Sequence, residues 1–137
     1  MTGSSNGDLP PVGGNVVEVG IRQGRLFLTF SDGGARERRL YLETDWHLDG
    51  YDFRLDEHSK EAAVSRLCRL LDAGLVRALS EEAGHLALDF GARGRLVVSG
   101  SAVQATKGDP WWLSPWIPAV VLDGSPAASV STLRPDD

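Results

Sequence analysis

The chain has few cysteines and lysines and no long apolar run, and each of these absences excludes a class of protein. Its single cysteine, Cys68, cannot form an intramolecular disulfide. No apolar stretch approaches the roughly 18 residues that a transmembrane helix needs, and no charged and then apolar leader opens the chain. We therefore expect a soluble cytoplasmic protein that does not bind a membrane.

Basic residues are outnumbered, because 19 acidic and 14 basic residues give a formal net charge of −5. Phosphates would be repelled at long range, so we do not expect nucleic-acid binding. The same charge favours a basic protein as the partner. A chain of 137 residues can bury about two-thirds of its unfolded surface as one domain, so the fold needs neither a disulfide nor a metal. The composition does not indicate an oligomeric state.

Motifs for catalysis, metal binding and phosphate binding are also missing. The pair Gly33-Gly34 joins two predicted strands instead of preceding a helix, so it is not a phosphate loop. Three aspartates surround His47, but their spacing lacks the acidic residue that closes an EF-hand loop, and we predict a polar turn there. Cys68 lies on the apolar face of a predicted helix, where a reactive thiolate is not expected. We therefore predict no catalytic residue, metal or cofactor, and an enzyme is the less favoured class.

Two similar segments occur in the chain. Each has an alternating apolar run, a Gly-rich turn and a second apolar run, at residues 26–30 and 39–42 in the first copy and 86–90 and 95–98 in the second. Alternation with a period of two places Leu26, Leu28 and Phe30 on one face, which is typical of antiparallel strands. We predict two three-stranded antiparallel meanders related by internal duplication. Two amphipathic hairpins can also look alike by chance.

One helix is predicted between the two meanders, over residues 56–73. Asp56 or Ser59 can accept the first free amides of the helix, and Gly74 can end it in a left-handed conformation. Apolar residues at three- and four-residue spacing form a stripe on one face of this segment. They are Val64, Leu67, Cys68 and Leu71. A helix with one apolar face must pack on a sheet.

The predicted fold is therefore an α+β domain in which the two meanders form one curved sheet or a half-open barrel with a single central helix. The domain spans residues 15–123, with the meanders at 16–48 and 75–122. Residues 1–14 and 124–137 are rich in Gly, Pro, Ser and Ala and hold few large apolar groups. We predict a disordered N-terminal tail and a flexible C-terminal tail.

Four tryptophans are the best candidates for function. Trp46 lies at the end of the first meander, next to His47. Trp111, Trp112 and Trp116 lie at the corresponding end of the second, within a proline-rich strip. Prolines keep such a strip extended, and exposed indoles anchor many protein interfaces. We predict that these five residues bind a partner or ligand, with Trp111 and Trp116 the more exposed pair. The alternative is that the rings close the open ends of the sheet.

Arginines concentrate in the loop and strand that follow Asp32. Arg36, Arg38 and Arg39 could contact an anion, such as a phosphate or a carboxylate of a partner. The alternative is a solvated hairpin in which Glu37 and Glu43 balance the charge.

Three short motifs in residues 13–122 resemble small actinobacterial single-domain proteins of unknown function. They are Gly14-Asn15-Val16-Val17, residues 26–30 followed by Asp32-Gly33, and Trp111-Trp112-Leu113. The arginine-rich composition fits an actinobacterial source as well. Similar proteins include immunity proteins of toxin systems, so the resemblance implies a toxin-neutralising role and no active site. The family often has an acidic residue directly before the last tryptophan motif, whereas this chain has Pro110 there.

These observations favour a noncatalytic domain that binds another protein and neutralises a toxin by covering a basic active site. The main alternative is a small-ligand or enzymatic domain with a pocket between sheet and helix. Such a pocket would be lined by Trp46, Tyr41 and Trp112, with a polar group from His47 or Arg39. A third possibility is a structural subunit of a larger complex.

Overall fold

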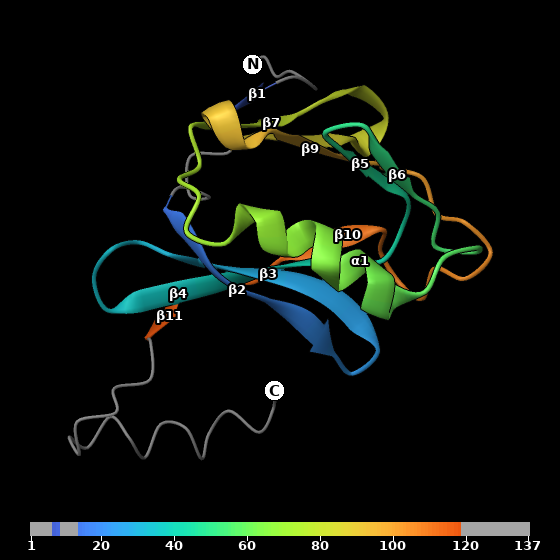
Figure 1. The fold of residues 1–137 in the computed structure, drawn as a ribbon, viewed down its shortest axis with the longest axis horizontal. Coiled ribbons are helices and arrows are strands. Elements are labelled where there is room, and N and C mark those ends of the chain that lie inside the picture. Colours follow the sequence, from blue (N-terminus) through green and yellow to red (C-terminus); the bar gives the residue numbers. More distant parts are fainter. Residues whose placement is uncertain (1–6, 9–13, 119–137) are drawn as a thin grey trace.

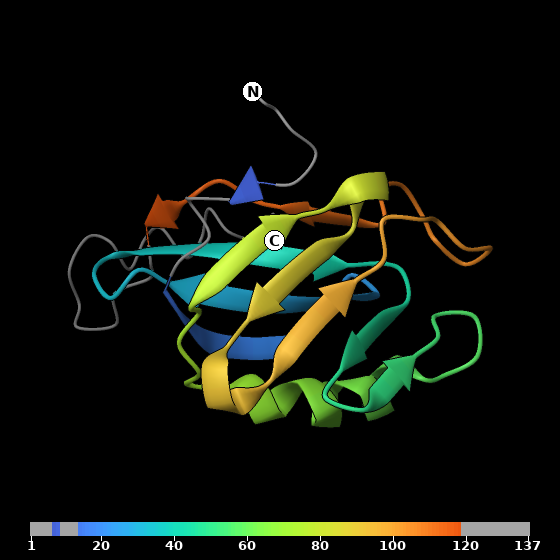
Figure 2. The same cartoon turned by 90° about the horizontal axis from the view of Figure 1, so that it is seen from above.

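The computed structural model describes residues 7–8 and 14–118. Two antiparallel sheets face each other across the core, and one short helix lies along an open side of this sandwich (Figure 1). Seen from above, the strands of the upper sheet run obliquely across those of the lower sheet (Figure 2). The chain therefore belongs to the α+β class, as predicted.

The lower sheet contains the first predicted meander. Its strand order is β10-β4-β3-β2, and β11 also pairs with β4. The five strands are β2 (Asn15–Arg22), β3 (Arg25–Ser31), β4 (Arg36–Leu42), β10 (Trp111–Leu113) and β11 (Ile117–Pro118). Val17 is an extra residue in β2, since the register shifts between Val16 and Glu18.

The upper sheet contains the second meander, and its strand order is β1-β7-β8-β9-β5-β6. The strands are β1 (Gly7–Asp8), β7 (Arg77–Ser80), β8 (Leu86–Asp89), β9 (Arg95–Val98), β5 (Trp46–Leu48) and β6 (Tyr51–Phe53). Strand β1 falls within the segment predicted to be a disordered tail. The predicted tail at 124–137 lies outside the described residues.

The prediction of one curved sheet or a half-open barrel is wrong, because the chain forms two separate sheets that do not close. The strand that follows each meander crosses to the other sheet and pairs with the last strand of the other meander. Thus Trp46 of β5 pairs with Val98 of β9, and Trp111 of β10 pairs with Leu42 of β4. Each sheet therefore contains residues from both halves of the sequence.

Corresponding strands of the two halves pair in the same register. In the first half Leu26 pairs with Leu42, and in the second half Leu86 pairs with Val98. The pairs Val19–Leu28 and Ala78–Leu88 correspond in the same way. Equivalent residues therefore occupy equivalent places in the two sheets.

The core lies between the sheets, and the predicted alternation is confirmed. Leu26, Leu28 and Phe30 are fully buried, as are Leu88 and Leu96 from the upper sheet. Burial of each such side chain contributes about 1.5–3 kcal/mol to folding. Phe30 and Phe90 stack across the core with ring centroids 6.4 Å apart. The space between sheets and helix is thus filled by side chains.

The helix is much shorter than predicted. Helix α1 (Lys60–Leu67) continues only as the 3₁₀ turn η2 (Cys68–Leu70). Ser59 is the N-cap, and its hydroxyl accepts a hydrogen bond from the Ala62 amide. Asp56 instead accepts a hydrogen bond from the Ala105 amide, which holds the loop before β10. The left-handed residue that follows η2 is Asp72, with φ of 68°, and not Gly74.

The polar turn predicted around His47 is confirmed as the tip of the β5–β6 hairpin. Asp49 and Gly50 both have positive φ, of 47° and 88°. Two-residue hairpin loops favour an Asp-Gly pair because both positions need the left-handed conformation.

The turn before β4 holds Asp32, whose contribution to stability we expect to depend on pH. The Gly34 amide donates to Asp32 over 2.8 Å, and Arg36 pairs with the same carboxylate over 3.1 Å. Both interactions favour the ionised form, so they hold the pKa of Asp32 below its ordinary value of 3.8. Because this pKa is lowered, the contribution of Asp32 to stability is present above pH 3.8 and is lost as the pH falls through the folded-state pKa.

An NMR titration of the Asp32 carboxyl carbon checks this expectation. The Arg36→Gln substitution should raise the pKa only part of the way, because the Gly34 amide, which has the larger effect, remains. A midpoint at or above 3.8 in the wild type would contradict the prediction.

Candidate functional site

Two of the predicted site tryptophans face the core. Trp46 is 3% exposed and stacks on Phe53, with ring centroids 5.0 Å apart. Trp111 is partly buried against the core, and its Nε1 donates to the Gly84 carbonyl over 2.8 Å. This hydrogen bond ties β10 of the lower sheet to a turn of the upper sheet. Trp111 was predicted to be among the more exposed, but both rings support the fold.

Trp112 has the opposite orientation, because neighbouring residues of a strand point to opposite faces. Its ring stacks on Tyr41 with centroids 4.9 Å apart, and the ring centroids of Tyr41 and Phe27 are 6.1 Å apart. The register places these three residues side by side on β10, β4 and β3. We call Phe27, Tyr41 and Trp112 the aromatic row. It lies on the outer face of the lower sheet.

Two arginines cover the ends of the aromatic row. The Arg25 guanidinium lies 5.3 Å from the centroid of Trp112, and that of Arg39 lies 5.4 Å from Phe27. These distances are typical of cation–π contacts. The Nε atoms of both arginines are buried without a hydrogen bond, and neither side chain has an ion pair among the described residues. We call the aromatic row with Arg25 and Arg39 the arginine–aromatic face.

The other two predicted anion contacts are placed elsewhere. Arg36 and Arg38 lie 5.5 and 5.2 Å from the Trp116 ring, which is partly buried. Arg36 pairs with Asp32, and Arg38 is 8% exposed and donates to the Ser114 carbonyl over 2.8 Å. Burial lowers the pKa of Arg38, although a guanidinium stays charged at any physiological pH. Of the three predicted arginines, Arg39 alone belongs to the arginine–aromatic face.

His47 lies on the outer face of the upper sheet, whereas its neighbour Trp46 on β5 points into the core. Its Nδ1 is 2.6 Å from Oδ1 of Asp52, and the Gly50 amide donates to Nε2 over 3.3 Å. The neutral imidazole therefore carries its proton on Nδ1. Both ring nitrogens make hydrogen bonds within the hairpin, so this arrangement fixes the orientation of the side chain.

A hollow of about 280 Å³ lies beside His47, and Asp52, His85 and Ser99 also line it. The Gly100 amide donates to Nδ1 of His85 over 2.8 Å. No hydrogen bond within residues 14–118 joins Ser99 to either histidine, so a nucleophile paired with a base is not assembled here. The predicted pocket of Trp46, Tyr41 and Trp112 is not formed, because Trp46 lies in the core and the other two on the outer face of the lower sheet.

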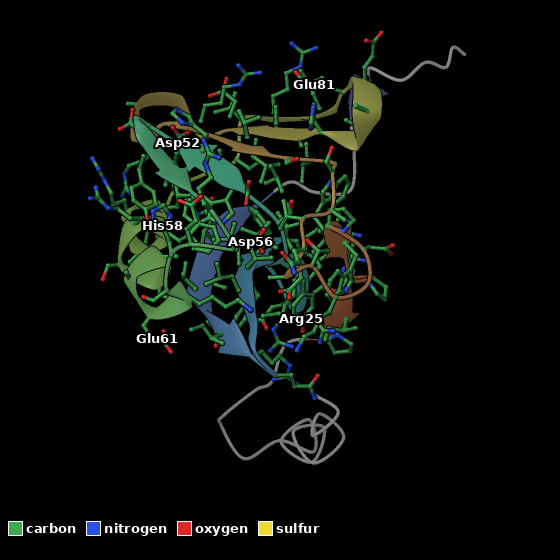
Figure 3. The ribbon with its side chains drawn as sticks, turned by 90° about the vertical axis from the view of Figure 1, so that its right-hand side faces the viewer. Arg25, Asp52, Asp56, His58, Glu61 and Glu81 are labelled. Carbon is green, nitrogen blue, oxygen red and sulfur yellow. The ribbon has the colours of Figure 1, made fainter. Side chains whose placement is uncertain are left out.

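A second hollow, of about 350 Å³, adjoins the arginine–aromatic face. Its lining consists of Arg25, Lys107, Gly108, Asp109 and Trp112. Sequence reasoning did not predict it, because residues 107–109 belong to an irregular loop whose position depends on contacts such as that of Asp56 with Ala105. The sequence indicated only that Arg25 and Phe27, two residues apart on β3, lie on the same face of the sheet. Figure 3 shows Arg25 at the lower sheet, well separated from Asp52 of the upper sheet.

Within residues 7–8 and 14–118, no group of three or more His, Cys, Asp or Glu side chains could hold a metal ion. The helix in this part of the chain is too short and too polar to cross a bilayer. Comparisons with protein-family models, with curated proteins and with solved structures find no match to this chain.

Proposed function

We propose that this protein is a noncatalytic, cytoplasmic protein-binding domain whose docking surface is the arginine–aromatic face. The observation that carries the proposal is the row of three aromatic rings with unpaired guanidinium groups over both ends. Tryptophan, tyrosine and arginine are the residues that dominate the binding energy of protein interfaces. Neutralising a toxin by covering its active site is one form that this function can take.

Comparison of the two sheets supports a functional origin for the aromatic row. The upper-sheet residues at the positions of Phe27, Tyr41 and Trp112 are Ala87, Val97 and His47, which form the corresponding cross-strand row. A sheet of this kind therefore does not need aromatic rings on its outer face. Phe27 is 5% exposed beneath Arg39, so the accessible rings of the row are those of Tyr41 and Trp112. Partly exposed rings beside cations are a common feature of interaction sites.

The equal registers also support the proposal that the two halves arose by duplication. Both meanders pair in the same alignment, and the strand after each meander joins the other at the equivalent residue. A fold reached independently has no reason to repeat every register. Reconstruction of ancestral sequences tests this, because the two halves must become more alike in earlier ancestors.

The experiment that tests the docking surface begins with capture from the native host by tagged wild-type protein. The captured protein is identified by mass spectrometry, purified separately and titrated by calorimetry. Trp112→Ala should weaken this purified complex about 30-fold or more, as expected for an interface anchor worth about 2 kcal/mol. Val76→Ala, a change at a side chain that is 70% exposed just before β7 of the upper sheet, is the matched control and should leave the affinity unchanged.

Thermal unfolding of both variants confirms that they are folded. Failure of the wild type to capture any protein, or equal affinity of wild type and Trp112→Ala, would overturn the proposal.

The hollow beside His47 favours a second candidate function, the binding of a small ligand. Its volume of about 280 Å³ is near the lower limit for ligand pockets, and the His47–Asp52 pair supplies a fixed polar group. A small molecule that binds the wild type, fails to bind His47→Ala and still binds Trp112→Ala would favour this candidate.

A further inference from the structure

We infer that the hollow beside Trp112 receives a carboxylate side chain of the partner, so that the partner presents an acidic segment to the arginine–aromatic face. This inference rests on the proposed function, because it states the chemistry of the partner that the face would bind. It also reverses the expectation of a basic partner that the net charge of the chain favours.

The hollow combines an apolar wall with two cations. Trp112 forms the wall, Arg25 lies over its ring at 5.3 Å, and Lys107 approaches from the loop before β10. Gly108 has φ of 81° and open space where a Cβ would stand, so the mouth of the hollow is not narrowed by a side chain. A volume of about 350 Å³ can admit the end of an aspartate or glutamate side chain.

The charges at the hollow have no partners in the described part of the chain. Neither Arg25 nor Lys107 makes an ion pair there, and the buried Nε of Arg25 has no hydrogen-bond acceptor. A guanidinium stacked on an indole is held in place and can donate two parallel hydrogen bonds to one carboxylate. An incoming carboxylate would therefore supply acceptors for the terminal nitrogens of Arg25, because its Nε is buried.

The charges near the hollow determine the sign of charge that a docking segment needs more than the net charge of −5 does. Exposed charges are screened over about 8 Å at physiological salt, so a docking segment senses mainly the groups that it touches. At the hollow, the two cations Arg25 and Lys107 outnumber the one carboxylate, Asp109. The two cations of the hollow suit a single carboxylate better than a nucleic acid, whose row of phosphates needs a longer stripe of cations and would meet the acidic remainder of the chain.

The probe that tests this inference is a peptide of six glutamates, titrated into the full chain and followed by NMR. The indole N–H of Trp112 should shift, whereas that of Trp111, which is hydrogen-bonded to Gly84, should not. Arg25→Gln and Lys107→Gln should each weaken peptide binding about tenfold, the loss expected for a hydrogen bond to a charged group. Arg95→Gln, on the upper sheet, is the matched control and should have no effect.

Three further titrations distinguish the ligand chemistry. Hexalysine should cause no shift at Trp112, and inorganic phosphate and six-residue oligothymidylate should bind more weakly than hexaglutamate. Absence of a hexaglutamate shift at millimolar peptide, equal binding by Arg25→Gln, or tighter binding of phosphate or oligothymidylate would each overturn the inference.

The inference and the proposed function fail separately. If Trp112→Ala loses affinity for the partner and the wild type does not bind hexaglutamate, the carboxylate site is contradicted and the docking surface is supported. If the wild type binds hexaglutamate but captures no protein, the docking surface is contradicted. The hollow is then a site for carboxylates that do not belong to a protein partner.

Discussion

The substitution Gly100→Ala is expected to lower the free energy of unfolding by about 3 kcal/mol, at the upper end of the usual range for overpacking. A Cβ on Gly100 would lie 2.1 Å from the Ala83 carbonyl oxygen and 2.4 Å from the carbonyl carbon of Gly84. Both contacts are with backbone, so no side-chain rotation can relieve them. The turn before β8 would have to move away and would strain the Gly100–His85 hydrogen bond.

Urea unfolding followed by circular dichroism measures this loss. Gly34→Ala is the matched control, because its new Cβ would approach nothing closer than 3.4 Å, at Oδ1 of Asp32, which is an ordinary contact distance. The control should stay within about 0.5 kcal/mol of the wild type. Equal stability of the two variants would show that the backbone approach at Gly100 is looser than described.

The second large effect is expected at Trp46, where substitution by alanine should cost about 3–5 kcal/mol. The ring is 3% exposed, stacks on Phe53 and meets Tyr51 at 5.8 Å. Its removal leaves a cavity in the core beside the ring of Phe53. Trp46→Ala therefore tests the core and not the docking surface.

Trp46→Phe separates packing from hydrogen bonding at the same position. The Nε1 of Trp46 is buried and has no hydrogen-bond partner, so phenylalanine removes a polar atom whose burial is unfavourable. We expect Trp46→Phe to cost about 1.5 kcal/mol or less, well below the alanine variant. The same urea experiment measures both. A loss as large as that of Trp46→Ala would mean that Nε1 itself stabilises the fold.

The sequence could not show which tryptophans are buried and which lie on the outer face. Trp111 and Trp112 are adjacent and chemically identical, yet one supports the core and the other lies on the outer face. The difference depends on the register in which β10 pairs with β4. Trp111 pairs with the inward-facing Leu42, and Trp112 pairs with the outward-facing Tyr41. That register joins residues about 70 positions apart and leaves no local signal.

Local patterns alone determined the β3, β4, β8 and β9 strands, their inward-facing leucines and the Asp49-Gly50 turn. Period-two alternation and left-handed turn residues act between near neighbours, so the sequence records them directly. The helix was predicted too long because an apolar stripe does not show where a helix ends. Helix α1 ends at Leu67, and the extended Leu71 and left-handed Asp72 follow the η2 turn.

Only the tertiary structure decided that the chain forms two sheets, that β5 and β10 exchange between them, and that Arg25 meets Trp112 and Lys107 in one hollow. Strand exchange depends on the free energy of burying two apolar faces against each other, which is a property of the whole chain. In an acidic sequence, the same long-range packing places two cations, Arg25 and Lys107, beside the ring of Trp112. Residue order set the strands, and burial between distant strands set the site.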